Sequence, residues 1–409
     1  MKVIYISRLF SGLEQSIIDR KWKPTGVPTI YRFLEKLESE SDELNIIFAI
    51  KDGFLKKKYS RNLKLKLEPF KNKIVVLSVQ KIFNFLPKRF HIVFREVSYT
   101  LFYFIKIIKL KPDIIYIDHA NIWSASLISR FFKIPTVFRV MGIYPVMRDA
   151  LNKRNFKSIV LKWFYKSPFR NVICTQDGSG VELWLKRAIN KKTTVEVMIN
   201  GVSKKLLNYS KDFELKKNDD IVISFIGKIE SSKGAEEFVR AAILSLNNCK
   251  LKLKFLIIGS GSLRKKLIEI TKEKGCINSF EFIEKVENKN IINFLVKTDI
   301  YVSLNKYGNL SNSNLEAIAI GKCIIMPKSQ PYLGIDVVTD KLIPESAVKR
   351  VKSNSDIKDI SNAICLLAKN LETRKEMERE IKKIGLKLND WDTRISKEIT
   401  ILKKIIKEK

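Results

Sequence analysis

The sequence predicts an α/β protein made of two doubly wound, Rossmann-like domains and a C-terminal helical segment. With 409 residues, the chain is too long for one ordinary core and suits two domains of about 200 residues each. Short, nearly continuous apolar runs alternate with stretches at helical spacing. Such runs are typical of parallel strands that helices cover on both faces. Because two series of this kind follow one another, we expect two domains that face each other.

The expected strands are regular in both halves. Those of the first half are KVIYIS at 2–7, NIIFAI at 45–50, KIVVLSV at 73–79, DIIYID at 113–118, PTVFRV at 135–140 and NVICTQ at 171–176. Those of the second half are DIVISFIG at 220–227, LKFLIIG at 253–259, SFEFIE at 279–284, DIYVSL at 299–304 and KCIIMP at 322–327.

A turn-rich, highly charged segment at 200–218 predicts the boundary between the domains. We therefore expect a first domain at 1–203 and a second at 204–385. A C-terminal helix at 386–409 is expected to return to the first domain.

The chain is strongly basic. It has 77 Lys and Arg residues against 43 Asp and Glu, which gives a net charge of +34. Such an excess favours contact with a polyanion, either a nucleic acid or an anionic membrane surface. Because the charge is spread along the whole chain, a lysine-rich compositional bias explains it equally well. No clustered basic and aromatic platform is present, so we expect no nucleic-acid partner.

Cysteine and histidine usage indicates a reducing compartment and no metal centre. The five cysteines form no CxxC pair, and the two histidines are His91 and His119. This pattern argues against a disulfide framework and against a zinc site. No signal-peptide architecture is present, and no apolar run reaches the roughly 18 residues that span a bilayer. We expect a cytoplasmic protein that is at most peripheral to the membrane.

The segment from Pro87 to Leu110 has apolar residues at helical spacing. The stripe consists of Phe90, Val93, Phe94, Val97, Leu101, Phe104, Ile105 and Ile108. We expect a helix that packs this stripe on the sheet before the strand at 113–118. The alternative is a basic amphipathic helix in a bilayer interface. Both interpretations hold if Phe102, Tyr103 and Ile107, which lie off the stripe, face lipid.

The segment FIGKIESSKG carries the first candidate site of the second half. Gly227 and Lys228 follow an expected strand, and Lys233 precedes an expected helix. Ammonium groups and free backbone N–H groups near a helix start suit a diphosphate. The alternative is an ordinary strand–turn–helix connection with solvated lysines.

An expected helix start at Ser311–Asn314 carries the second candidate site. These residues offer several N-cap groups before LEAIAI, and Gly321 ends the helix. A helix N-terminus at the carboxyl edge of a parallel sheet is a place where phosphates bind. Glu316, expected in the first turn, either complements the helix dipole as a structural acid or accepts hydrogen bonds from ribose hydroxyls.

These motifs, in their order and spacing, resemble the C-terminal half of family 4 glycosyltransferases of the GT-B fold. The motifs are MINGVSKKL, FIGKIESSKG, LIIGSGSLRKKL, TDIYVSLN and SNSNLEAIAIGK. In that family a cationic pair, which matches Lys228 and Lys233, clamps the nucleotide diphosphate, and the ribose-binding glutamate matches Glu316. The resemblance implies that Lys233 and Glu316 are catalytic. It also implies a donor site made of Gly227, Lys228, Lys233, Ser311, Asn312, Ser313, Asn314, Leu315 and Glu316.

The resemblance is weaker at two positions. Gly308 replaces a family glutamate that contacts the donor sugar, and Met141 in FRVMGIYP replaces the histidine of a V-H-G motif. In the first half, Gly26 best matches the entry of the family's glycine-rich loop into its helix. The candidates for the acceptor or sugar side are Gly26, Val27, His119, Arg139 and Met141.

The resemblance implies a hexosyl- or N-acetylhexosaminyl-type glycosyltransferase. It would move the sugar from a nucleotide diphosphate sugar to a saccharide or lipid-linked saccharide, with retention and without a metal or other cofactor, in surface polysaccharide or glycan biosynthesis. Cations and helix amides would stabilise the departing diphosphate. The alternatives are a nucleotide-binding scaffold without turnover, a nucleotide-sugar epimerase and a basic nucleic-acid-binding protein. An anionic membrane surface is the further partner that the charge suggests.

Overall fold

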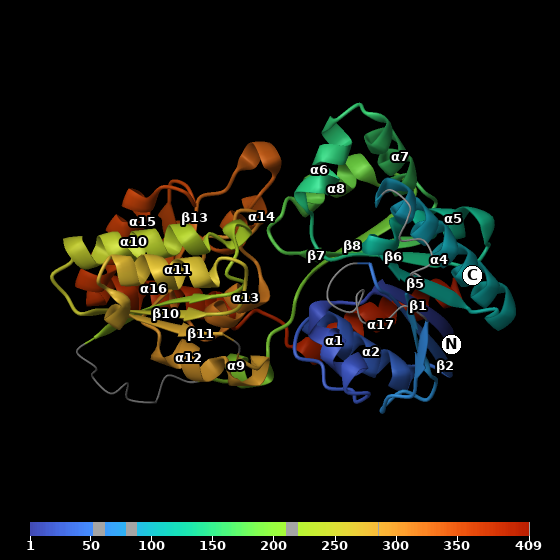
Figure 1. Ribbon diagram of the computed structural model, residues 1–409, viewed down its shortest axis with the longest axis horizontal. Coiled ribbons are helices and arrows are strands. Elements are labelled where there is room, and N and C mark those ends of the chain that lie inside the picture. Colours follow the sequence, from blue (N-terminus) through green and yellow to red (C-terminus); the bar gives the residue numbers. More distant parts are fainter. Residues whose placement is uncertain (52–61, 79–87, 210–219, 285, 409) are drawn as a thin grey trace. The chain divides into compact units, whose positions relative to one another are not determined.

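The computed structural model describes residues 1–51, 62–78, 88–209, 220–284 and 286–408 (Figure 1). The chain forms two compact units: the first contains 1–175, 184–198 and 392–409, and the second contains 176–183 and 199–391. This division differs from the expected boundary at 203 because residues such as Val202 lie in the core of the second unit. Part of the expected linker, 210–218, lies outside the described residues, as do Val79 and Pro87.

The first unit is built on an eight-stranded sheet in the order β3-β4-β2-β1-β5-β6-β7-β8. Its strands are β1 (Lys2–Arg8), β2 (Glu43–Ala49), β3 (Leu63–Leu65), β4 (Ile74–Leu77), β5 (Ile114–Asp118), β6 (Thr136–Val140), β7 (Asn171–Gln176) and β8 (Thr194–Ile199). The pairs from β4 to β7 are parallel, and β3 pairs with β4 antiparallel. The six predicted strands are all present, whereas the short β3 and the half-exposed β8 were not predicted.

Helices and a shared apolar core complete this unit. The helices of this part of the chain are α1 (Ser11–Ile18), α2 (Pro28–Glu40), α4 (Lys88–Leu110), α5 (Ile122–Phe131), α6 (Pro145–Asn152), α7 (Phe156–Tyr165), α8 (Val181–Ala188) and α17 (Trp391–Lys407). Tyr5 of β1 and Tyr116 of β5 stack in the core with ring centroids 5.3 Å apart. Ile395, Ile399 and Leu402 of α17 lie in the same core, so residues 392–409 belong to the first unit.

A buried ionic group ties α17 to the sheet. The Glu398 carboxylate accepts hydrogen bonds from the Tyr116 hydroxyl and from Arg394, and one of its oxygens lies 3.2 Å from Nε of Arg139. Burial alone would raise the pKa of Glu398, but the guanidinium groups of Arg394 and Arg139 hold this pKa below its usual range. The group therefore remains charged inside the core.

Helix α4 faces the sheet with the side opposite to the predicted one. Tyr99, Tyr103 and Ile107 are buried, whereas most of the predicted stripe is exposed. The Tyr99 hydroxyl donates to the carbonyls of Ile50 and Leu77, at 3.0 and 3.1 Å. The buried Lys51 ammonium lies 2.7 Å from the Glu96 carboxylate of the same helix face. Polar partners inside the unit thus decide the orientation of a helix that is apolar on two sides.

The second unit is built on a six-stranded sheet in the order β11-β10-β9-β12-β13-β14, with parallel pairs throughout. Its strands are β9 (Ile221–Ile226), β10 (Leu253–Ile258), β11 (Phe280–Ile283), β12 (Ile300–Val302), β13 (Cys323–Pro327) and β14 (Lys349–Val351). The five predicted strands of this half are present, and only β14 was not predicted.

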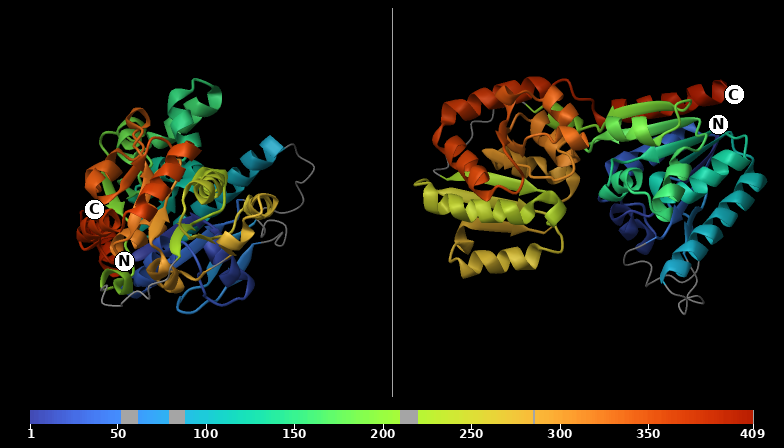
Figure 2. Two further views of the ribbon diagram at one scale, coloured as in Figure 1. Left: turned by 90° about the vertical axis from the view of Figure 1, so that its left-hand side faces the viewer. Right: turned by 90° about the horizontal axis from the view of Figure 1, so that it is seen from above.

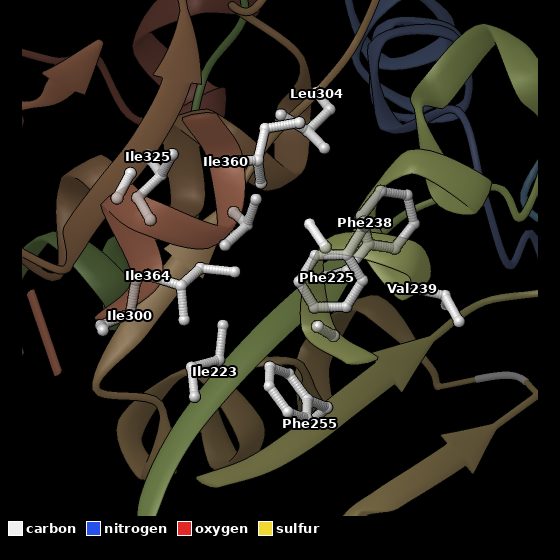
Figure 3. Packing of buried hydrophobic residues seen from close by; sticks show 14 of the residues in the cluster. Ile223, Phe225, Phe238, Val239, Phe255, Ile300, Leu304, Ile325, Ile360 and Ile364 are labelled. Atoms are coloured by element: carbon white, nitrogen blue, oxygen red, sulfur yellow. The ribbon is translucent and has the colours of Figure 1, made fainter. Parts of the chain in front are cut away.

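Helices cover both faces of this sheet. They are α9 (Lys204–Leu207), α10 (Ala235–Asn248), α11 (Arg264–Glu273), α12 (Ile292–Lys297), α13 (Asn312–Ala319), α14 (Val337–Leu342), α15 (Ile357–Lys369) and α16 (Leu371–Gly385). On one face, Phe225, Phe238 and Phe255 pack together between the strands and α10 (Figure 3). On the other face, α12, α13 and α16 cover a second apolar cluster. This is the arrangement that near-continuous apolar strands predict.

None of the helices in the described ranges combines the length and the hydropathy needed to cross a bilayer.

Candidate functional site

The candidate site of the second unit lies where β9 and β12 end, at the carboxyl edge of its sheet. These strands are neighbours, so the segments that follow them lie next to each other. The Lys306 ammonium after β12 lies 2.6 Å from the Glu237 carboxylate of α10 and 3.4 Å from the Ser231 hydroxyl. The Lys306 backbone N–H also donates to the carbonyl of Ser232 at 3.0 Å. The two predicted motifs are therefore parts of one edge.

Glycines allow three chain segments to approach closely at this edge. A Cβ atom on Gly259 would lie 1.8 Å from the carbonyl oxygen of Gly227, and one on Gly261 would lie 2.3 Å from that of Ile229. Gly234 has a φ of 73°, and its Cβ would lie 2.6 Å from the carbonyl oxygen of Leu304. The glycine pair of IIGSGS thus packs one loop on the next.

Lys233 and Lys228 are the two cations of the site that the sequence predicts. Lys233 ends a short 3-10 turn, Ser231–Lys233, just before α10, and its backbone N–H donates to the carbonyl of Glu230 at 3.0 Å. Its ammonium group has no hydrogen bond or ion pair within the described ranges. Burial lowers the pKa of its ammonium group; the Asp177 carboxylate opposes this effect, and Lys228 lowers the pKa further. Lys228 itself is exposed. Two close ammonium groups, one of them poorly solvated, favour a bound anion.

Asp177 belongs to this site and was not predicted from the sequence. It follows β7 in the segment that packs with the second unit, and its carboxylate accepts a hydrogen bond from the Ser179 backbone N–H at 3.0 Å. Burial raises the pKa of Asp177 to about 6, although the hydrogen bonds from Ser179 and the charge of Lys233 oppose this. The signal in the sequence was the turn QDGSG directly after a buried strand.

The start of α13 presents three of the predicted polar side chains. Ser311 is the N-cap residue, and its hydroxyl lies 3.2 Å from that of Ser313. Asn312 accepts a hydrogen bond at 2.8 Å from Nδ2 of Asn200, which lies in the MINGV motif. No side chain caps this helix start by a hydrogen bond. Its first N–H groups therefore remain suited to an anionic ligand.

Two predicted donor-binding residues serve the fold instead. Leu315 is buried in the apolar core. Asn314 is also buried; its Oδ1 accepts from the Tyr301 hydroxyl at 2.8 Å, and its Nδ2 donates to Ser303 at 2.8 Å and to the Asn309 carbonyl at 2.9 Å. Neither side chain is available to a ligand.

Glu316 lies in the second turn of α13, not in the first turn as predicted, because the helix begins at Asn312. Its carboxylate accepts a hydrogen bond at 2.7 Å from Nδ2 of Asn288, a residue that the sequence analysis missed. Burial raises the pKa of Glu316 to about 7, and the hydrogen bond from Asn288 opposes this shift. A buried acid away from the first turn gains little from the helix dipole. The structure therefore does not support Glu316 as an acid that complements this dipole.

The structure gives a steric reason for glycine at position 308, where the resemblance places a glutamate. Its φ is 128°, and a Cβ atom would lie 2.5 Å from the Asp177 carbonyl oxygen and 2.6 Å from the backbone of Ser179. The Asp336 carboxylate holds the next residue, Asn309, through its backbone N–H and its side chain, both at 2.7 Å. The chain segment around Asp177 therefore occupies the space that a side chain at 308 would need.

In the first unit, Gly26 and Val27 form the predicted entry into α2. A Cβ atom on Gly12 would lie 2.6 Å from Cα of Gly26, so two backbone segments touch here. Val27 has φ 50° and ψ 57°, a left-handed conformation that is rare for a β-branched residue. Backbone strain of this kind is concentrated at functional loops.

His119, Met141 and Arg139 follow or end neighbouring strands of the same sheet. The His119 ring stacks on Tyr144 at 5.9 Å, and burial, with the charges of Arg8 and Lys51, lowers its pKa to about 4. Met141 packs partly buried against the core.

The structure does not support Arg139 as an acceptor contact. Its guanidinium group is 1% exposed and donates to Thr175 at 2.7 Å, in addition to its contact with Glu398.

Across the described part of the chain, no three His, Cys, Asp or Glu side chains are grouped as metal ligands require. At this edge of the second sheet, Lys228, Lys233 and the start of α13 supply positive charge and N–H donors. Glu316 and Asn288 supply hydrogen-bond acceptors and donors beside them. This combination is complementary to a nucleoside diphosphate.

Comparison with solved structures defines the class of fold. The chain is similar to a sucrose-phosphate synthase from Thermosynechococcus elongatus, with a TM-score of 0.72, 14% identity and coverage of 100% of both chains. It is also similar to the HepE protein of Anabaena, solved in complex with UDP, with a TM-score of 0.64, 13% identity and coverage of 99% of this chain and 100% of that one. The protein therefore has the GT-B fold, with two Rossmann-like units and C-terminal helices.

Comparison of sequences finds a family match within the second unit. Residues 209–384 match the family described as Glycosyl transferases group 1. An uncharacterized glycosyltransferase of Methanocaldococcus jannaschii, MJ1069, is 26% identical over 218 residues, which are 49% of this chain and 54% of that protein. The chain thus spans about half the length of this curated relative. The segment that matches this family contains Lys228, Lys233 and Glu316.

Proposed function

We propose that the protein is a glycosyltransferase that takes a sugar from a nucleotide diphosphate sugar bound at the edge around Lys233. The observation that carries this proposal is the Lys233 ammonium group, which has no ion-pair partner in the described residues and lies beside Lys228 in a glycosyl transferases group 1 domain. A phosphate group placed there would replace the solvation that burial removes from the ammonium.

The residues of the edge supply what departure of a nucleoside diphosphate requires. Negative charge grows on the diphosphate as the glycosidic bond to the sugar breaks. Lys228, Lys233 and the N-terminal N–H groups of α13 would stabilise this charge in place, without reorganisation of solvent. Glu316 would accept hydrogen bonds from the ribose hydroxyls, and these bonds favour the ionised form of a carboxyl group whose pKa is about 7.

We propose transfer with retention by a family 4 enzyme, without a metal or other cofactor, of a hexosyl or N-acetylhexosaminyl group. The acceptor would be a saccharide or lipid-linked saccharide of a surface polysaccharide or glycan, at the cytoplasmic face of a membrane. Solved relatives in complex with UDP and UDP-glucose make uridine donors the first to test.

A thermal-shift screen of uridine and guanosine diphosphates and their sugars tests donor binding. A ligand that binds the folded state raises its melting temperature by mass action. The Lys233→Ala variant should bind that nucleotide about 10- to 100-fold more weakly, because a charge-assisted hydrogen bond to phosphate is lost. Lys272→Ala, an exposed lysine on α11, is the matched control and should bind normally. Absence of any shift across the panel, or an equal shift in Lys233→Ala, would refute the assignment.

A nucleotide-binding scaffold without turnover is a second candidate. The observation that favours it is Gly308, since the backbone of residues 177–179 leaves no room for a carboxylate there. Chromatography of the donor separates the two functions. Release of the nucleoside diphosphate, slowly to water or faster with a saccharide acceptor, supports the transferase. Tight binding without release across the donor panel supports the scaffold.

A further inference from the structure

Helix α4 presents a row of apolar side chains to solvent. The row consists of Phe90, Val93, Val97, Leu101, Ile105 and Ile108, all of which are exposed. Phe90 and Ile105 are each 65% exposed and Leu101 is 58% exposed. From first to last residue the row extends about 27 Å at 1.5 Å per residue. A continuous apolar surface of this kind marks an interaction site.

The apolar surface continues from α4 onto α5 and α7. Phe131, at the end of α5 and 71% exposed, has its ring centroid 6.1 Å from that of Phe104 on α4. Arg130 places its guanidinium carbon 3.9 Å from the ring centre of Trp163 on α7. Trp163 and Phe156, on α7, are both exposed. Figure 2 shows α4, in the cyan part of the colour scale, along the outside of the first unit.

The exposed charges on these three helices have one sign. The only acidic residue in α4, α5 and α7 is Glu96, which is buried and paired with Lys51 and Arg95. The lysines and arginines that border the apolar row and its continuation are exposed or half-buried: Lys106, Lys109, Arg130, Lys157 and Lys162. Basic groups beside an apolar row are complementary to a lipid layer whose surface is anionic and whose interior is apolar.

We propose that the α4 row, extended by α5 and α7, docks the first unit on an anionic lipid bilayer. The helix would lie in the plane of the interface, with the apolar row at the level of the upper acyl chains and the basic groups among the lipid phosphates. A second copy of the chain is a poorer occupant, because it would bring like charges together across the contact. The docking surface is separate from the donor edge, which belongs to the other unit, and so its test does not depend on donor binding.

Vesicle flotation tests the proposal with the full-length chain. The probes are vesicles of phosphatidylcholine alone and of phosphatidylcholine mixed with phosphatidylglycerol. We expect flotation only with the mixed vesicles and a decrease as salt rises. The double variant Leu101→Glu with Ile105→Glu should lose flotation, and because both side chains are exposed, its melting temperature should stay that of the wild type. Leu386→Glu, equally exposed at 65% in the second unit, is the matched control and should float normally.

Charge reversal gives a second, independent arm. Each basic residue at an anionic surface increases the partitioning of a protein onto vesicles by about five-fold. The double variant Lys106→Glu with Lys109→Glu should therefore weaken partitioning onto the mixed vesicles by at least about 25-fold. Lys272→Glu with Lys274→Glu on the second unit changes the net charge equally and should have little effect. Equal flotation with both vesicle types, none with either, or unchanged flotation of the Leu101→Glu and Ile105→Glu variant would overturn the proposal. A dimer in sedimentation that this variant dissociates would assign the surface to a second copy and overturn it as well.

Discussion

Replacing Glu316 with glutamine separates a ligand-binding carboxylate from a structural acid. The side chain is 4% exposed, and its carboxylate accepts a hydrogen bond from Asn288 at 2.7 Å. Burial raises its pKa from 4.5 to about 7. Glutamine has nearly the same shape, keeps an acceptor for Asn288 and carries no charge. It therefore removes the desolvation cost while it preserves the packing.

The raised pKa translates into a free energy of unfolding. Because the folded state holds this proton more tightly than the unfolded state, the contribution of Glu316 to stability is complete at low pH and is lost as the pH rises through about 7. The interval between 4.5 and about 7 corresponds to about 3 kcal/mol. We expect Glu316→Gln to raise the free energy of unfolding of the ligand-free protein by up to about 3 kcal/mol near pH 8.5, and by only about 1 kcal/mol near pH 5.

The assay combines urea unfolding, followed by circular dichroism at the two pH values, with calorimetry of nucleotide binding. The same variant should bind the nucleotide about 10-fold more weakly, because a hydrogen bond to a charged acceptor is lost. Glu376→Gln, at an exposed position of α16, should change neither quantity.

A structural acid predicts the opposite pattern. If Glu316→Gln lowers the free energy of unfolding at both pH values and leaves nucleotide affinity unchanged, the carboxylate serves the helix. The reasoning from burial would then be refuted.

Two further predictions concern the packing that shapes the units. Gly308→Ala should lower the free energy of unfolding by about 1–3 kcal/mol, because its Cβ would lie 2.5 Å from the backbone oxygen of Asp177. Gly275→Ala, at φ 66° with no neighbour within 4 Å, is the control and should lower it less. An equal loss in both variants, measured by thermal unfolding, would contradict the steric argument. Glu398→Gln should destabilise the first unit by about 3–5 kcal/mol, since it leaves the buried Arg139 and Arg394 without their counter-charge. A change below about 1 kcal/mol in chemical denaturation would show that this carboxylate is dispensable.

The amino-acid sequence by itself determined the strands and the position of the candidate site at the carboxyl edge of the second sheet. Strands covered on both faces need apolar side chains at nearly every position, and this local requirement is visible without any partner. The helix start at Ser311 and the cations Lys228 and Lys233 were visible for a similar reason. Glycines and N-cap residues mark where strands end and helices begin.

Tertiary structure decided which side chains reach the candidate sites. Arg139 looked available next to its strand, but Glu398, which is 259 positions further along the chain, buries and pairs it. Asp177 and Asn288 reach the candidate site of the second unit from segments that carry no motif of their own. The glycine at 308 is required by the backbone of residues 177–179, which lie far from it in the sequence.

The orientation of α4 shows the physical reason most directly. Periodicity identified an amphipathic helix, but apolar residues lie on two of its sides, and hydrophobicity alone does not choose between them. Glu96 and Tyr99 decide the orientation, because the Glu96 carboxylate pairs with Lys51 and the Tyr99 hydroxyl bonds to the carbonyls of Ile50 and Leu77 inside the unit. A buried polar group must be paired, and its partner is set by the fold and not by neighbours in the sequence.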